Sequence, residues 1–252
     1  MTSGDLSEQL EQAGYTLPQP ALELMQGYLA ALERDRERLD LTAISTREEL
    51  VARQVVESLA LLHLIDQMAT SPPRGGGMRE GVTLADLGSG GGVPGIPMAI
   101  ARPAWQVTLI EGSTRKADWL RETAATLGLD LRVVGERAED AAHNPEYRAA
   151  FDLVVAKAVA RLAILVELSL PLLKVGGRLL AQKGSRVGDE VTEAEGLLPA
   201  LGGKLQGSVP LLDSAELNSV VVVVDKVSPT ESRYPRRTAA LYRRTQSKSL
   251  GA

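Results

Sequence analysis

The sequence lacks cysteine altogether and has few histidines and aromatics: its 252 residues include two His, one Phe and 3% aromatic residues. Without cysteine there are no disulfides, thiolate metal ligands or cysteine nucleophiles, which fits a reducing compartment. Two histidines, His63 and His143, poorly supply a metal site or a Ser-His-Asp triad, so we expect no metal. So few aromatics also argue against a surface built for stacked bases.

Recognisable targeting and membrane segments are missing as well. The start of the chain, Met1–Asp5, has neither the basic nor the apolar region of a signal peptide. No apolar run reaches the roughly 18 residues that a membrane helix requires. We therefore expect a soluble, cytoplasmic protein that contacts no membrane.

Charge is present but unevenly distributed. Residues 1–232 hold 22 Lys and Arg and all 32 Asp and Glu, whereas residues 233–252 hold six basic residues and no acid. An acidic body with a basic end favours an anionic partner that is met at one place. A solvated, charged chain end explains the same pattern equally well.

The pattern of apolar, Pro and Gly residues predicts four segments. Residues 1–68 carry apolar side chains at helical spacing and predict a helical N-terminal cap. Residues 69–81 are rich in Pro and Gly and predict a linker loop. Residues 82–232 are expected to form the main domain, and residues 233–252 a basic C-terminal tail.

The main domain alternates short apolar runs with helical patterns, which predicts βαβ units and a mostly parallel sheet. Two later apolar runs, joined by residues 213–216, predict an antiparallel hairpin, and five consecutive Val in the second indicate a strand buried on both faces. The expected fold class is α/β, with a C-terminal antiparallel hairpin and an N-terminal helical extension. The expected strands are 82–87, 107–111, 131–134, 151–156, 178–182, 204–212 and 217–227, and the expected helices are 94–101, 114–127 and 161–173.

The segment DLGSGGGVPGIP, which begins at Asp86, leaves an expected strand and enters a helix. Its glycines allow positive φ and a close approach of a ligand to the backbone. The spacing Gly90-x-Gly92-x-x-Gly95 fits the dinucleotide pattern, which is a weak signal by itself. The alternative register, Asp86-x-Gly88-x-Gly90-x-Gly92, places an acid beside the loop and resembles the first motif of class I S-adenosylmethionine-dependent methyltransferases. That acid suits the sulfonium and amino-acid end of S-adenosylmethionine and would repel a pyrophosphate.

Glu111 ends the second expected strand, 23 residues after Gly88. An acid roughly 20 residues beyond such a loop accepts hydrogen bonds from ribose hydroxyls. Because dinucleotides and S-adenosylmethionine both carry a ribose, Glu111 predicts a nucleoside without separating the two cofactors.

Together these residues closely resemble the bacterial 16S rRNA guanine-N7 methyltransferase G family, also called glucose-inhibited division protein B. The resemblance runs from about Leu39 to Arg237, and the Gly-Val-Pro-Gly-Ile-Pro end of the loop is its most specific part. It implies a class I, Rossmann-like methyltransferase that uses S-adenosylmethionine to methylate N7 of one guanine in 16S rRNA. It also implies the small ribosomal subunit as partner. We expect a monomer. Further matching segments are Leu41–Ile44, Ser58–Ala60, Arg115–Lys116, Lys183–Gly184 and Tyr234–Arg237.

The same resemblance implies which residues bind the cofactor. Loop residues, the stretch after the second strand, a pair that borders the adenine and one cation after the fourth strand match the family's contacts. The residues expected at the cofactor are Asp86, Gly88, Ser89, Gly90, Val93, Glu111, Gly112, Ser113, Ala138, Glu139 and Lys157.

Four positions depart from the family's usual residues. Asp40 stands where Asn is common, Gln54 where His is common, and Glu57 where Asp is common. Lys157 replaces an Arg, which keeps the charge but loses the planar fork of the guanidinium. What these departures do is left open by the sequence.

The expected chemistry needs few catalytic groups. Guanine N7 carries an exposed lone pair, so its attack on a sulfonium methyl requires no general base. The protein is expected to act by aligning the reactants and excluding water. Zero cysteine argues against methylation of cytosine C5. An Asn/Asp-Pro-Pro-Tyr/Phe motif for exocyclic amines is also missing, since its place is taken by Ala156–Arg161.

Basic residues near expected strand ends and in the tail are candidates for RNA contact. Ligands of open α/β sheets bind beyond the carboxyl ends of the strands, and tail arginines can bind phosphates without reading sequence. Lys183 also keeps a ribose 2′-O methylation site open as a minor alternative. The expected substrate-side residues are Lys157, Arg161 and Lys183, and the expected phosphate contacts are Arg233, Arg236 and Arg237.

Two other functions compete with methyl transfer. A nicotinamide-dependent oxidoreductase would use the Gly90-x-Gly92-x-x-Gly95 spacing, but no Tyr-x-x-x-Lys or His-based hydride-transfer set follows the loop. A non-enzymatic RNA-binding module with a vestigial cofactor fold would keep the basic tail and not use the loop.

Overall fold

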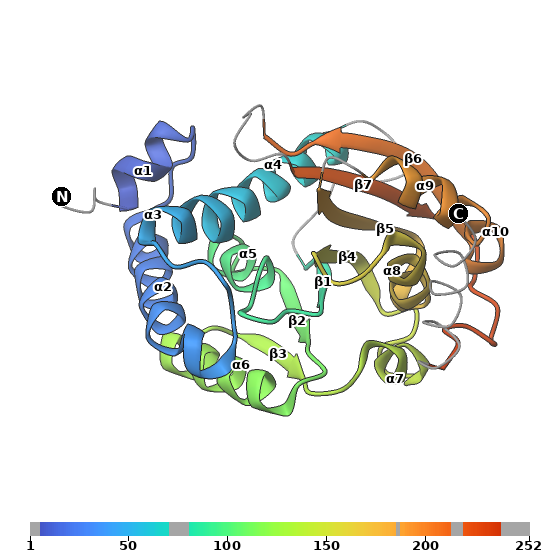
Figure 1. Cartoon of the computed structure of the whole chain (residues 1–252), viewed down its shortest axis with the longest axis horizontal. Coiled ribbons are helices and arrows are strands. Elements are labelled where there is room, and N and C mark those ends of the chain that lie inside the picture. The colour runs from blue at the N-terminus through green and yellow to red at the C-terminus, as the bar shows by residue number, and fades with distance from the viewer. Residues whose placement is uncertain (1–5, 71–80, 185–186, 213–218, 238–252) are drawn as a thin grey trace, which may run out of the picture.

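The computed structural model describes residues 6–70, 81–184, 187–212 and 219–237, and it is built around one seven-stranded sheet (Figure 1). The strand order is β3-β2-β1-β4-β5-β7-β6. The first five strands are parallel to one another, while β7 is antiparallel to both β5 and β6. This confirms the predicted α/β sheet with an antiparallel C-terminal hairpin. The strands are β1 (Thr83–Leu87), β2 (Gln106–Ile110), β3 (Leu131–Val134), β4 (Phe151–Lys157), β5 (Leu173–Gly184), β6 (Gly203–Pro210) and β7 (Ser219–Lys226).

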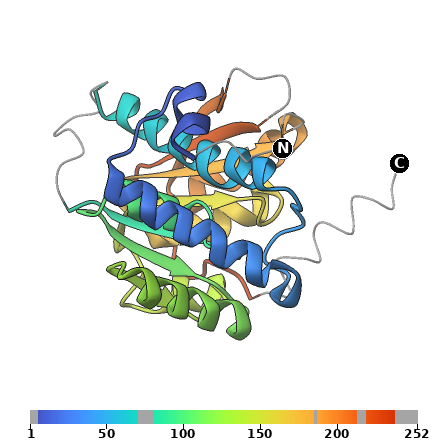
Figure 2. The same cartoon turned by 90° about the vertical axis from the view of Figure 1, so that its left-hand side faces the viewer.

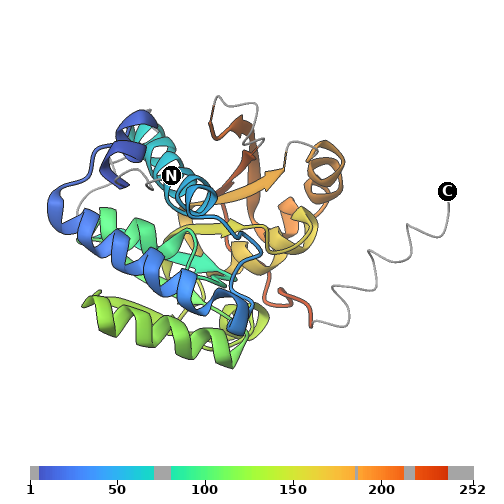
Figure 3. The same cartoon turned by 60° about the vertical axis from the view of Figure 1, so that its left-hand side comes forward.

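Helices cover both faces of this sheet, because its strands carry apolar side chains on both sides. Figure 3 shows α2 and α6, blue and green, on one side of the sheet and the gold and brown helices α8 and α9 on the other. The helices are α1 (Leu6–Gln12), α2 (Gln19–Leu39), α3 (Arg47–Leu50), the π-helix η1 (Val51–Val56), α4 (Glu57–Thr70), α5 (Gly95–Ala101), α6 (Thr114–Leu127), α7 (Ala138–His143), α8 (Leu162–Ser169), the 3-10 helix η2 (Leu170–Leu172), α9 (Gly188–Glu195) and α10 (Leu198–Leu201).

The N-terminal helices share one apolar core with the sheet. Residues of α2 and α4, such as Leu29 and Ile65, are fully buried together with Leu84 of β1 and Ile96 of α5. Figure 2 shows α2 beside α6, lying across the front of the sheet. The predicted helical cap is therefore present as helices, and its burial makes it part of the same packed unit as the sheet.

Several predicted boundaries differ from the structure. Helix α4 continues to Thr70, so the first two residues of the expected linker are helical. Strand β5 begins at Leu173, well before the expected start at Arg178. A side chain on Gly177 would lie 2.8 Å from the carbonyl oxygen of Asp152, where the β4–β5 register shifts. Gly177 therefore marks a close approach of β5 to β4 and not the boundary of the strand. The rest of the linker (71–80), the connection 213–216 and the tail after residue 237 lie outside the described residues.

The order of the strands determines where ligands bind in folds of this kind. The chain runs outward from β1 through β2 to β3, then returns to the other side of β1 as β4. Neighbouring connections therefore diverge beyond the carboxyl ends of β1 and β4, which is the crevice used by ligands in open α/β sheets. The glycine-rich segment and Lys157 both lie at this edge.

Candidate functional site

The glycine-rich loop connects β1 to α5 at the crevice. Gly88 has a φ of 72°, and a side chain there would stand 2.8 Å from a methyl carbon of Val159. A residue with a Cβ would be strained at this φ and would also push against the chain that follows β4. The loop after β1 and the loop after β4 therefore pack directly on each other at Gly88.

Asp86 supports this loop from beneath. Its side chain is fully buried, and its Oδ2 accepts a hydrogen bond of 3.0 Å from the backbone N–H of Gly95. Its Oδ1 has no partner among the described residues, and burial raises the pKa of Asp86 to about 7. Asp86 is one of the residues expected at the cofactor; its buried side chain lies behind the loop and holds the start of α5.

The N-terminal cap holds the other side of the loop. The hydroxyl of Tyr28, on α2, is fully buried and donates a 2.7 Å hydrogen bond to the carbonyl oxygen of Gly91. A side chain on Gly91 would meet Leu32 of α2 at 3.0 Å. The loop is thus fixed between the sheet and α2, so its shape depends on a helix more than 50 residues earlier in the chain.

Glu111 closes the loop across the crevice. It follows β2 directly, and its Oε2 accepts 2.8 Å from the N–H of Gly90 while its Oε1 accepts 2.8 Å from the N–H of Ser113. The carboxylate is half-buried, and each oxygen keeps a second lone pair for another donor. Sequence reasoning placed Glu111 near a ribose; the structure places it beside the glycine loop, as that interpretation requires.

The segments after β2 and β3 meet beside Glu111. An ideal Cβ on Gly112 would lie 3.6 Å from the side chain of Arg137, which directly precedes α7. Ala138 and Glu139 are the first residues of that helix. The structure therefore brings the predicted loop, ribose and adenine residues to one edge of the sheet, although they come from three connections.

These residues fit an adenosyl-sulfonium ligand. The crevice offers a carboxylate for ribose hydroxyls at Glu111, glycine backbone without side chains at Gly88 and Gly90, and no cationic cradle for a pyrophosphate within the described loop. The site therefore matches S-adenosylmethionine better than a dinucleotide.

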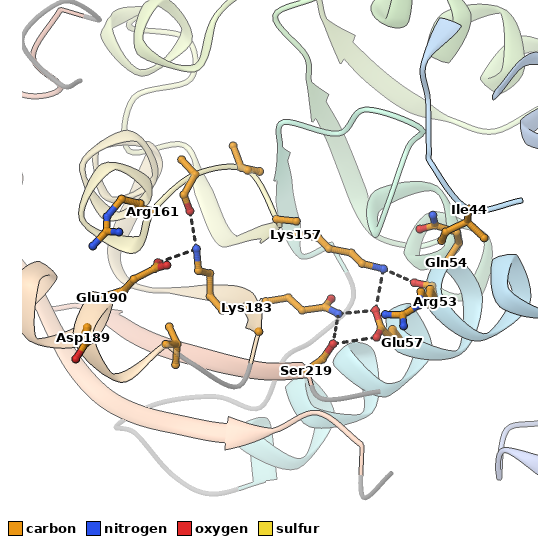
Figure 4. A pocket seen from close by; sticks show the side chains of 16 residues that line it. Ile44, Arg53, Gln54, Glu57, Lys157, Arg161, Lys183, Asp189, Glu190 and Ser219 are labelled. Atoms are coloured by element: carbon orange, nitrogen blue, oxygen red, sulfur yellow. Dashed lines mark hydrogen bonds and ion pairs between the residues drawn. The ribbon is translucent and has the colours of Figure 1, made fainter. Parts of the chain in front are cut away.

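A cleft of about 1090 Å³ opens next to the loop, beyond the ends of β4 and β5 (Figure 4). Val159, whose side chain contacts Gly88, is one of its wall residues, so the cleft and the cofactor edge share that wall. The other walls come from η1, α4 and the start of α9. Its lining residues are Ile44, Arg53, Gln54, Glu57, Lys157, Ala158, Val159, Ala160, Arg161, Gln182, Lys183, Gly184, Val187, Asp189, Glu190 and Ser219.

One wall of the cleft is built around a buried ion pair. The ammonium of Lys157 lies 2.8 Å from the carboxylate of Glu57, which is only 1% exposed. Gln182 donates to Glu57 over 2.6 Å and Ser219 over 2.9 Å, so that carboxylate is held by three donors. Burial lowers the pKa of Lys157, and the charge of Glu57 opposes that shift.

The opposite wall holds two further ion pairs. Lys183 lies 2.8 Å from Glu190, which also accepts from the N–H of Leu162 at the start of α8. Arg161 lies 2.7 Å from Glu193 on α9. Sequence reasoning found three of the cations that line the cleft, Lys157, Arg161 and Lys183, but not the glutamates that pair with them.

The family departures gather near this cleft. Lys157 and Glu57, both departures, contact each other. Gln54 donates to the hydroxyl of Thr42 over 3.3 Å. Asp40 has a φ of 52°, a left-handed conformation that Asn and Asp adopt more readily than other side chains. Two of the four departures, Glu57 and Lys157, therefore form one ion pair.

The three tail arginines occupy different surroundings. Arg236 is bound by Glu167 of α8, a fully buried carboxylate, through its backbone N–H at 2.7 Å and its guanidinium Nε at 2.9 Å. Arg233 pairs with Glu231 over 2.8 Å, and Arg237 is exposed. All three were predicted to contact phosphate; the structure shows that the Arg236 side chain also binds a buried carboxylate of the fold.

Comparison with known proteins identifies the family. The sequence model described as "rRNA small subunit methyltransferase G" matches residues 21–217. The Ribosomal RNA small subunit methyltransferase G of Roseiflexus castenholzii is 40% identical over 225 residues, covering 88% of this chain and 91% of that protein. The protein of the same name from Lactobacillus delbrueckii subsp. bulgaricus is 35% identical over 234 residues, covering 92% and 94%.

Solved structures agree on the fold. A crystal structure of an MtNAS mutant in complex with S-adenosylmethionine has a TM-score of 0.54 and 16% identity, covering 88% of this chain and 78% of that one. MtNAS in complex with MTA and tNA gives a TM-score of 0.53 at 15% identity, covering 83% and 76%. At such identities the likeness concerns the fold alone, and it confirms the predicted class I methyltransferase architecture. With a family model that spans most of the chain and relatives that match almost end to end, the chain belongs to the rRNA small subunit methyltransferase G family.

Proposed function

We propose that this protein transfers the methyl group of S-adenosylmethionine to N7 of one guanine in the 16S rRNA of the small ribosomal subunit. Family membership over residues 21–217 carries the proposal. The geometry supports it, because a nucleoside edge at Glu111 and a cleft of about 1090 Å³ meet at the loop after β4. The relatives from Roseiflexus castenholzii and Lactobacillus delbrueckii both carry the name of a methyltransferase, which favours methyl transfer over the oxidoreductase and vestigial-binding interpretations.

S-adenosylmethionine supplies an electrophilic methyl group when bound. We assign its binding to backbone and side chains of the loop and strand ends, with Asp86 supporting the loop from behind and Glu111 accepting from the ribose. The assigned residues are Asp86, Gly88, Ser89, Gly90, Val93, Glu111, Gly112, Ser113, Ala138, Glu139 and Lys157.

The protein's contribution to the reaction is alignment. Guanine N7 already presents a lone pair, so no side chain has to remove a proton from it before attack. The packed contact between Gly88 and Val159 brings the cofactor edge next to the cleft, where a base can be held in line with the methyl group. Exclusion of water from this cleft protects the reactive donor.

The substrate side is cationic but internally paired. We assign Lys157, Arg161 and Lys183 to contacts with the guanine or its neighbouring phosphates, and Arg233 and Arg237 to phosphate contacts from the tail. RNA phosphates would have to replace Glu190 and Glu193 as partners of the cations on the α9 side. Arg236 is assigned to holding the chain end on α8.

The proposal extends to the setting in which the protein works. We propose a monomer that acts in the cytoplasm on the rRNA of the small subunit. Among the described residues, no helix is both long enough and apolar enough to span a membrane.

Calorimetry and rRNA mapping test the proposed function together. S-adenosylmethionine should bind the purified protein, and Gly88→Asp should abolish that binding while leaving a folded protein. Mass mapping of 16S rRNA from a deletion strain should reveal one missing methyl group on guanine N7, restored by the wild-type gene but not by the G88D gene. Full methylation of 16S rRNA in the deletion strain would refute the assignment.

A further inference from the structure

Lys157 presents a partly committed ammonium at the cleft. An ammonium has three N–H donors and no acceptor. Within the described parts of the chain, two acceptors bind it: a carboxylate oxygen of Glu57 and the backbone carbonyl of Arg53. Figure 4 shows the side chain reaching across the cleft toward these two groups. One donor remains for a ligand, and 18% of the side chain is exposed in the cleft wall.

Local structure fixes the direction of this ammonium. The π-helix η1 precedes α4, and the N–H of Glu57 bonds back to the carbonyl of Ala52, five residues earlier. Where the α-helical register resumes, one backbone carbonyl receives no hydrogen bond from the helix. This is the carbonyl of Arg53, which accepts from the ammonium of Lys157. Glu57 itself is held by Gln182 and Ser219. Both acceptors are therefore rigid, which orients the remaining donor.

The ammonium also stands at the boundary between cofactor and substrate. Lys157 is the last residue of β4, and the next residue, Ala158, has a φ of 55°, a left-handed conformation unusual for alanine. This turn brings Val159 against Gly88 and makes the segment a shared wall. Strained backbone at such a position is a frequent feature of ligand sites. A base held with N7 toward the cofactor edge would bring the substituent on C6, which lies next to N7, close to this wall.

The chemistry of the purine edge then separates guanine from adenine. Beside N7, guanine presents the acceptor O6, whereas adenine presents an N6 amino donor. A group that can only donate is compatible with guanine O6, whereas it would place a donor against the donor amino group of adenine. N7 itself stays free for the methyl group.

The buried carboxylate of Glu57 balances the charge of Lys157 near the reacting base. Methylation of N7 leaves a positive charge on the base, which an isolated ammonium nearby would oppose. The charge of Lys157 is balanced by Glu57 at 2.8 Å, so the pair presents a hydrogen-bond donor without a net positive charge.

We propose that Lys157 is a specificity-determining residue that donates to O6 of the target guanine, and that Glu57 and the Arg53 carbonyl position it. This inference rests on the proposed function, because it assumes a guanine in the cleft.

The test combines protein variants with a changed base. The substrate is small-subunit rRNA with either guanine or 2-aminopurine, which keeps N7 but lacks O6, at the mapped target position. The main variant is Glu57→Gln with Lys157→Met, because K157M alone would leave Glu57 buried without its cation. K157R retains donors. Lys174→Met is the matched control, since Lys174 pairs with Asp152 over 2.9 Å at the opposite edge of the same two strands.

Wild type, K157R and K174M should prefer guanine over 2-aminopurine in kcat/KM by about tenfold or more, the value of one good base contact. In E57Q/K157M this preference should fall by about tenfold. The preference compares two bases on the same protein at the same S-adenosylmethionine concentration, so it does not depend on any change in cofactor affinity. An unchanged preference in the folded double variant would overturn the inference. Absence of wild-type methylation on guanine would overturn the proposed function, and this inference with it.

Discussion

Removal of the Arg236 side chain should destabilise the protein strongly, although Arg236 lies in a basic segment that the sequence assigns to RNA. Its guanidinium binds both carboxylate oxygens of Glu167, at 2.9 and 3.1 Å from Nε, and Glu167 is fully buried. In Arg236→Ala that carboxylate keeps only the backbone N–H of residue 236 as a donor from this segment.

The magnitude follows from leaving one partner of a buried pair uncompensated. Such a change costs about 3–5 kcal/mol, and the remaining backbone hydrogen bond places the expected loss near about 3 kcal/mol. For a chain of this size that loss lowers Tm by about 6–12 °C. Arg237→Ala, at an exposed neighbouring position, should change the unfolding free energy by less than about 0.5 kcal/mol.

Urea unfolding followed by circular dichroism measures both variants. E167Q/R236A should recover most of the loss, because a neutral amide can be buried at lower cost than a lone carboxylate. A loss below about 1 kcal/mol in R236A, together with the same drop in rRNA affinity as R237A, would refute the reasoning and return Arg236 to the RNA surface.

Three further predictions concern the site. Gly88→Ala should weaken S-adenosylmethionine binding at least about tenfold in calorimetry, because the φ of 72° is strained for alanine and its Cβ meets Val159. V159A in the same chain should recover part of the loss. An unaffected Kd would contradict the packed contact. Asp86→Asn should change how stability depends on pH. Burial raises the pKa of Asp86 to about 7, so the folded state holds a proton that the unfolded state loses near pH 4, and the stability of wild type relative to D86N should fall between about pH 4 and pH 7. A constant difference in urea titrations would show that Asp86 is ionised throughout. E57D and K157R should each reduce rRNA methylation, whereas the double variant should recover activity because a shorter acid fits a longer base. The expected coupling in a double-mutant cycle is about 1–3 kcal/mol. Additive losses would mean that the two side chains do not act as a pair.

Most of the sheet and the cofactor edge could be predicted from the sequence. Strand β3 and helix α6 have the expected bounds, because apolar periodicity and a following glycine mark them locally. The glycine loop and Glu111 were also identified, since a ligand that approaches backbone closely imposes glycine at a fixed distance from the strand.

The features that were missed depend on contacts between distant segments. Glu57 and Lys157 are 100 residues apart, and only the packing of α4 against the end of β4 brings them together. The pairing of Arg236 with Glu167 likewise requires the chain end to cross α8. A charged residue inside an apolar helical pattern, as at Glu57 and Glu167, was the one local signal that could have pointed to buried ion pairs.

Methyl transfer in vitro tests the central claim most directly. Purified protein, labelled S-adenosylmethionine and small subunits from a strain without this gene should give one labelled methyl group per 16S rRNA, and mass spectrometry should place it on N7 of a single guanine. A label on a ribose oxygen, or no label from folded protein that binds the donor, would contradict the account.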